Sequence, residues 1–114
     1  MKVAVIGSRS IGRVDLGKYL PEDVTEIVSG GARGIDTCAK EYALANHLGF
    51  TEFLPQYERY GRSAPLKRNL SIIDYSDLVI AFWDGVSRGT KYVIDSCKMQ
   101  EKKLVVHYIA RKES

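Results

Sequence analysis

The sequence lacks most of the features that mark specialised classes of protein. It has two cysteines, Cys38 and Cys97, but no CxxC pair and no Cys/His cluster, so neither a zinc site nor a disulfide scaffold is expected. No apolar run is long enough to span a bilayer, and residues 1–6 are too short for the apolar region of a signal peptide. We therefore expect a cytoplasmic protein with reduced thiols, without a metal ion and without a membrane partner.

The chain also lacks a large excess of charge of either sign. Its 114 residues include 17 Lys and Arg against 14 Asp and Glu, which gives a net charge of +3. Such an excess favours an anionic ligand but is too small to prove binding to nucleic acid. The hydrophobic fraction of 45 % is ordinary for a globular protein, and the length predicts one domain that spans residues 1–114.

Short apolar runs alternate with helical patterns along the chain. Apolar residues at helical spacing predict a clear helix that begins at Ile35 and two more around Leu66 and Val93. Residues 10–20 are only weakly patterned, and there we expect a loop and a short helix near residues 15–20 that ends before Pro21. The stretch between residues 56 and 64 is predicted to be a polar, aromatic loop. The predicted strands are residues 2–6, 24–28, 50–54, 77–82 and 104–109.

This alternation predicts an α/β fold with a parallel sheet. The strands are apolar throughout, which is typical of strands that helices cover on both faces. Right-handed crossovers then give a Rossmann-like, doubly wound sheet of five strands, in the order 3-2-1-4-5. In that order successive strands are added on one side of the first strand and then on the other, so the switch point lies between the first and fourth strands. The loops after strands one, two and four therefore line one crevice.

The most informative stretch is residues 29–36, with the sequence Ser-Gly-Gly-Ala-Arg-Gly-Ile-Asp. Three glycines in five residues let a ligand approach the main chain, and the helix that follows presents its N-terminus to an anion. The stretch predicts contact with a phosphate, with a plain strand-to-helix turn as the alternative. Its candidate ligand-binding residues are Ser29, Gly30, Gly31, Arg33, Gly34 and Asp36.

The other loops of the crevice supply further candidates. A guanidinium pairs two donors with phosphate oxygens, so arginines suit this site, although each of them could equally be a surface charge. Trp83, Tyr57 or Tyr60 could stack on a base or simply pack. The remaining candidate ligand-binding residues are Gly7, Ser8, Arg9, Arg68, Asn69, Arg88, Gly89 and Thr90.

Four segments in this order, residues 7–9, 29–36, 67–69 and 77–82, resemble the SLOG superfamily and its YspA-like branch of small single-domain members. The superfamily has a Rossmann-like fold and includes the DNA-processing protein A family and the Lonely Guy phosphoribohydrolases. The resemblance covers nearly the whole chain. It implies a nucleotide or nucleotide-derived ligand at the three loops, with Gly7-Ser8-Arg9, Arg68-Asn69 and Gly89-Thr90 at matching positions. By analogy it also implies a homodimer.

One departure from that resemblance concerns catalysis. The Lonely Guy enzymes carry a glutamate shortly after their Gly-Thr pair, and this chain has Val93 three positions after Thr90. Cleavage of an N-glycosidic bond usually needs a carboxylate near the sugar. Asp84 is the candidate catalytic residue for that reaction, with an ordinary turn residue as the alternative. Whether the chain is an enzyme stays open.

The sequence therefore predicts a nucleotide-binding, sensor-like protein whose partner is a small phosphorylated nucleoside. No cofactor beyond this ligand is predicted. The first alternative is a phosphoribohydrolase-like enzyme that cleaves a nucleotide N-glycosidic bond. The second is a module that binds single-stranded nucleic acid, against which the modest charge and the absence of an aromatic–basic stripe count.

Overall fold

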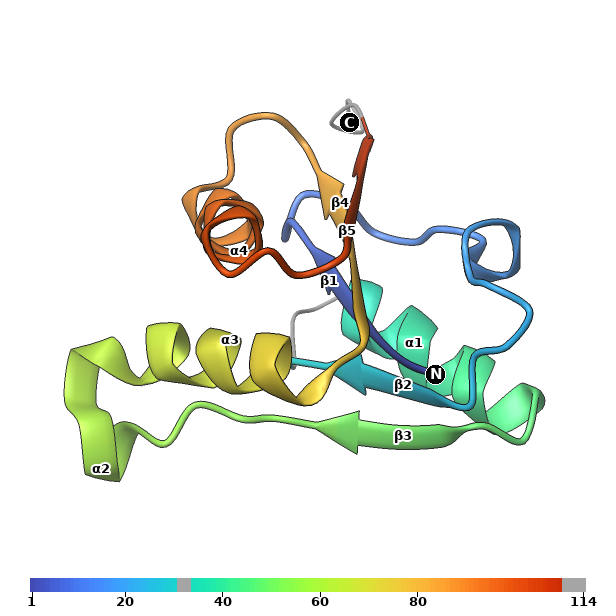
Figure 1. Cartoon of the computed structure of the whole chain (residues 1–114), viewed down its shortest axis with the longest axis horizontal. Helices are drawn as coiled ribbons and strands as arrows, with labels where there is room; N and C mark the ends of the chain where they lie inside the picture. The colour runs from blue at the N-terminus through green and yellow to red at the C-terminus, as the bar shows by residue number, and fades with distance from the viewer. Residues whose placement is uncertain (31–33, 110–114) are drawn as a thin grey trace.

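The computed structural model describes residues 1–30 and 34–109 (Figure 1). Its five strands are all parallel and form one sheet in the order β3-β2-β1-β4-β5, which confirms the predicted α/β, Rossmann-like architecture. The elements in chain order are β1 (Lys2–Gly7), η1 (Leu16–Lys18), β2 (Glu26–Ser29), α1 (Ile35–Ala45), β3 (Gly49–Glu52), α2 (Tyr57–Tyr60), η2 (Gly61–Ser63), α3 (Ala64–Tyr75), β4 (Leu78–Trp83), α4 (Arg88–Met99) and β5 (Leu104–Tyr108).

Helices cover both faces of the sheet. Figure 1 shows α1 on one side and α3 and α4 on the other. Successive residues of a strand point to opposite faces. In β1, Val3 and Val5 accordingly belong to the core on the α1 side, and Ala4 belongs to the core under α3 and α4. Both cores contain fully buried β-branched side chains. The burial of each large apolar side chain stabilises the fold by about 1.5 to 3 kcal/mol.

The end of β1 lies unusually close to α1. A Cβ atom on Gly7 would lie 2.1 Å from Cγ1 of Ile35 and 2.9 Å from its Cβ. Ile35 is the first residue of α1 and is fully buried, so it has no room to move aside. Gly7 is therefore required for the packing of α1 on the sheet, whatever it contributes to a ligand.

Several local predictions differ from the structure, including the bounds of some strands. The second strand begins at Glu26 and not at residue 24, because the N–H of Val24 donates to the carbonyl of Pro21 in a turn, and the pairing with β1 starts at Glu26 and Lys2. The short helix near residues 15–20 is only the 3₁₀ turn η1. The predicted loop of residues 56–64 contains α2 and η2, since the N–H groups of Arg59 and Tyr60 both donate to the carbonyl of Gln56.

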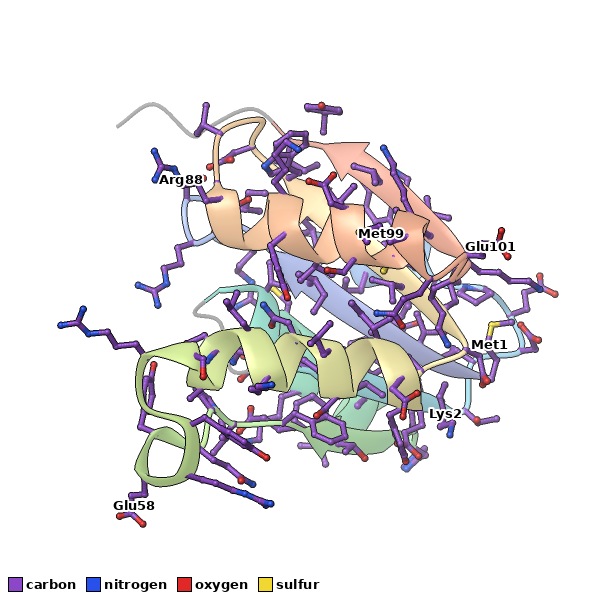
Figure 2. All side chains as sticks on the ribbon, turned by 60° about the vertical axis from the view of Figure 1, so that its left-hand side comes forward. Met1, Lys2, Glu58, Arg88, Met99 and Glu101 are labelled. Atoms are coloured by element: carbon purple, nitrogen blue, oxygen red, sulfur yellow. The ribbon has the colours of Figure 1, made fainter. Side chains whose placement is uncertain are left out.

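The topology brings the candidate loops to one end of the molecule. Figure 2 shows α3 and α4 side by side in front of the sheet, with Arg88 of α4 and Glu58 of α2 at the same end. Parallel strands all direct their carboxyl ends to one edge, and the helices that follow them begin there. No helix in the described ranges is both long and apolar enough to cross a membrane.

Candidate ligand-binding cleft

A cleft of about 700 Å³ lies at the point where the strand order reverses. The ends of β1 and β2, the loop after β4 and the first turns of α3 and α4 form its walls. It therefore occupies the position predicted for the crevice. The predicted site residues that line it are Gly7, Arg9, Ser29, Gly30, Arg68, Asn69, Asp84, Gly89 and Thr90.

Four other predicted site residues are described but do not line the cleft: Ser8, Gly34, Asp36 and Arg88. Ser8 is buried behind the wall, where its Oγ lies 3.2 Å from Thr90 Oγ1 and accepts a hydrogen bond of 3.3 Å from the backbone N–H of Asp84. This hydroxyl joins the end of β1 to α4 and to the loop after β4. The predicted residues Gly31 and Arg33 lie outside the described residues.

Asp36 does not line the cleft, but it contacts Ser29, which does. Its Oδ1 accepts a hydrogen bond of 2.7 Å from the Ser29 hydroxyl. A side-chain hydrogen bond with Asp36 raises the pKa of Glu52, and burial and the Asp36 charge raise it further, while Lys40 acts in the opposite direction. Ser29 and Glu52 face each other in the register of β2 and β3. Asp36 therefore holds the start of α1 to these two strands.

Two arginines, Arg9 and Arg68, give the cleft a net positive charge, since Asp84 is the acidic residue that lines it. Arg68 is partly buried, and its Nε donates a hydrogen bond of 2.8 Å to Asn69 Oδ1 while its Nη1 donates to the carbonyl of Gly30. Burial lowers the pKa of Arg68, nearby Tyr57 opposes that change, and the charge of Arg9 lowers the pKa further. A guanidinium still keeps its proton at neutral pH. Two positive groups that repel each other thus face one cleft, which favours an anion between them.

Asp84 organises the loop that follows β4. Its Oδ1 accepts hydrogen bonds from the backbone N–H groups of Val86 (2.9 Å) and Ser87 (2.8 Å), and its Oδ2 accepts one from the Ser10 hydroxyl (2.5 Å). Ser87 in turn caps α4, because its side chain accepts a hydrogen bond from the N–H of Thr90. These hydrogen bonds give Asp84 a structural role, which accounts for an aspartate at this position without a role in catalysis.

Asp84→Ala is therefore expected to lower the free energy of unfolding by about 1 to 2 kcal/mol, because two backbone N–H groups and one hydroxyl lose their acceptor. Asp84→Asn keeps an Oδ1 acceptor and should lose about half as much. Urea denaturation of the two variants measures the difference. An alanine variant as stable as the parent protein would contradict this structural role.

The mouth of the cleft is apolar, and most of the residues that form it were not predicted from the sequence. Tyr57 was one of three aromatic candidates for stacking, and it is 60 % exposed at the mouth. The other mouth residues come from three separate segments and carry no motif, so only the folded chain shows that they meet. They are Leu54, Pro55, Pro65, Leu66 and Val86.

Side chains that could ligate a metal ion, and the two cysteines, lie apart from one another in the described part of the chain. In residues 1–30 and 34–109, no three His, Cys, Asp or Glu side chains gather closely enough to hold a metal ion. Both cysteines are buried free thiols, Cys38 in α1 and Cys97 in α4. Burial raises the pKa of the Cys97 thiol, which disfavours the reactive thiolate.

Residues 1–56 match the model of the family described as DNA recombination-mediator protein A. The matched part contains the loops after β1 and β2 but neither α3 nor the loop after β4. No curated protein and no solved structure matches the chain. Over these residues, slightly less than half of its length, the chain is thus similar to that family.

Proposed function

We propose that the chain binds a nucleotide or a nucleotide derivative, with the phosphate held in the cleft. The observation that carries the proposal is the convergence of Arg9 and Arg68 on this cleft. The Rossmann-like fold and the family match over residues 1–56 are both consistent with a nucleotide-related binding role. A volume of about 700 Å³ is also in the range that small-molecule sites occupy.

The elements around the cleft suggest how such a ligand would lie. The first turn of α4 lines the cleft through Gly89 and Thr90 and adds the positive end of its dipole to the two arginines. A phosphate is therefore best stabilised in the part of the cleft farthest from the mouth, between the first turn of α4 and Arg68. The sugar and base would then extend to the apolar mouth, where Tyr57 offers an exposed ring.

Titration calorimetry with nucleoside monophosphates and with the matching nucleosides tests this proposal. We expect the monophosphates to bind at least about tenfold more tightly than the nucleosides, because only they carry the group that the arginines recognise. Equal affinities, or no binding at millimolar concentration, would overturn the proposal. The same samples, assayed for released base, test the alternative of N-glycosidic cleavage.

Gly89→Val is expected to weaken monophosphate binding about tenfold or more while the protein stays at least as stable. The new side chain meets no atom within 4 Å of its Cβ, so it would occupy the cleft without disturbing the core. Thermal melting and calorimetry on the same sample check both parts. Gly12→Val is the matched control, because position 12 is equally open but does not line the cleft. Unchanged affinity in Gly89→Val would remove α4 from the site.

A second candidate function is the binding of single-stranded nucleic acid, and the family match over residues 1–56 favours it. The phosphate in the cleft would then belong to a strand and not to a free nucleotide. Gel-shift titrations at two salt concentrations distinguish the cases, because binding to a strand weakens steeply as salt rises. No shift near physiological salt would exclude this candidate.

A further inference from the structure

One short segment carries a net positive charge equal to that of the whole chain. Residues 56–69 contain four cations, Arg59, Arg62, Lys67 and Arg68, and one anion, Glu58. Their net charge of +3 equals that of the whole chain, so the remainder has as many anions as cations. This segment forms α2, η2 and the first half of α3. This segment therefore supplies cations to one side of the cleft, while Arg9 comes from the loop after β1.

That segment encloses a second hollow. A groove of about 520 Å³ runs between α2 and α3, and both Leu54 and Arg68 line it as well as the cleft. Figure 2 shows α2, marked by Glu58, beside the first turns of α3. The two hollows therefore share a wall. The side chain of Arg68 stands in that wall.

The groove combines cations with an aromatic ring. Lys67 Nζ lies 5.9 Å from the centre of the Tyr60 ring, and the Arg59 guanidinium carbon lies 5.2 Å from it. Both cations and the ring line the groove, and Asp74 is the acidic residue that lines it. Phosphate contact from cations beside an aromatic ring that a base can stack on is the usual way to hold a nucleotide unit of a strand.

These cations are not neutralised by neighbouring carboxylates. Within the described residues, the ion pairs are Arg13 with Glu41 and Lys91 with Asp95, and none involves residues 56–69. Ordinary surface charges of mixed sign tend to pair or to alternate. Three of them, Arg59, Lys67 and Arg68, line the groove. Three cations outside these ion pairs, in a groove next to the proposed anion site, indicate a ligand with more than one phosphate-bearing unit.

We propose that the groove between α2 and α3 is a second subsite for the ligand of the cleft, and that this ligand has two nucleoside units joined through phosphate. The inference rests on the proposed function, since it places one of the two units in the cleft. Arg68 lines both hollows and is positioned for the phosphate that joins the units. Arg59, Tyr60 and Lys67 then hold the second unit.

Titration calorimetry with AMP and with the 5′-phosphorylated linear dinucleotide pApA tests the inference. We expect pApA to bind about tenfold or more tightly than AMP, because the second unit binds at a high effective concentration. Lys67→Ala and Tyr60→Ala should each reduce that advantage to about twofold or threefold. Both side chains are exposed, so melting temperatures should stay the same. Lys91→Ala, on the exposed face of α4 and paired with Asp95, is the charge-matched control and should keep the full advantage.

The outcomes separate the inference from the function on which it rests. If AMP binds and pApA binds no more tightly, the second subsite is wrong while the proposed function stands. If neither binds, the proposed function itself fails. The affinity for a ten-nucleotide oligoadenylate then shows whether the two nucleoside units belong to a free dinucleotide or to a longer strand. Affinity equal to that of pApA identifies a free dinucleotide, and a higher affinity with a steeper salt dependence identifies a strand.

Discussion

Replacing Gly34 with alanine is expected to lower the free energy of unfolding by about 3 kcal/mol or more. Gly34 is the N-cap of α1 and has φ of +79°, a conformation that a residue with a Cβ rarely adopts. The added Cβ would also lie 2.5 Å from the carbonyl oxygen of Gly12 and 2.6 Å from that of Ile11. Both obstacles are backbone atoms, so no side chain can turn aside to relieve the contact.

The contact also joins the start of α1 to the loop after β1. Ile11 and Gly12 belong to the loop after β1 that carries Arg9, and the N–H of Ile11 donates to the carbonyl of Ser8. An alanine at position 34 would therefore displace this loop as well as the start of α1. We expect ligand affinity to fall together with stability, although Gly34 itself does not line the cleft.

Gly12→Ala is the control for this experiment. It adds the same methyl group on the other side of the same contact, yet its Cβ would meet nothing within 4 Å. Its free energy of unfolding, measured by urea denaturation, should stay within about 0.5 kcal/mol of that of the parent protein. If Gly34→Ala were as stable as Gly12→Ala, the observed conformation at position 34 would be wrong.

The architecture and the place of the cleft could be predicted because they depend on patterns that the sequence states directly. Continuous apolar strands that alternate with helices indicate a covered parallel sheet, and the strand order then determines which loops meet. Arg9, Gly30 and Asp84 do line one cleft, as expected. Their meeting follows from topology alone and needs no knowledge of side-chain contacts.

The roles of individual residues could not be predicted, because they depend on distances between elements. Nothing in the sequence shows that Gly7 lies too close to Ile35 for a Cβ atom to fit between them. Nor does it show that the Ser8 hydroxyl is buried behind the cleft, where it contacts Thr90. The groove between α2 and α3 was missed for the same reason. Tyr60 and Lys67 meet only because the segment that looked like a loop folds into two short helical turns.

Replacing Arg68 with methionine is expected to weaken the binding of a nucleoside monophosphate by about 2 to 3 kcal/mol, or thirtyfold or more. The change removes the guanidinium of α3 that lines the cleft. This guanidinium donates a hydrogen bond to the carbonyl of Gly30, which also lines the cleft. Methionine keeps an apolar stem of similar length, so the packing against Gly30 is largely preserved. Arg68→Lys should have an intermediate effect, because it keeps the charge but loses the paired donors.

The stability of the Arg68→Met variant should change little, because two effects offset each other. The carbonyl of Gly30 and the Oδ1 of Asn69 each lose a donor, which destabilises the fold. In return the variant no longer holds a partly buried cation near Arg9, whose charge disfavours the protonated guanidinium. Arg13→Met is the control, since Arg13 is exposed and pairs with Glu41 of α1 on the opposite side of the sheet. Calorimetry at fixed ionic strength should show normal affinity for Arg13→Met and a large loss for Arg68→Met. Equal affinities in two folded variants would mean that the phosphate lies elsewhere.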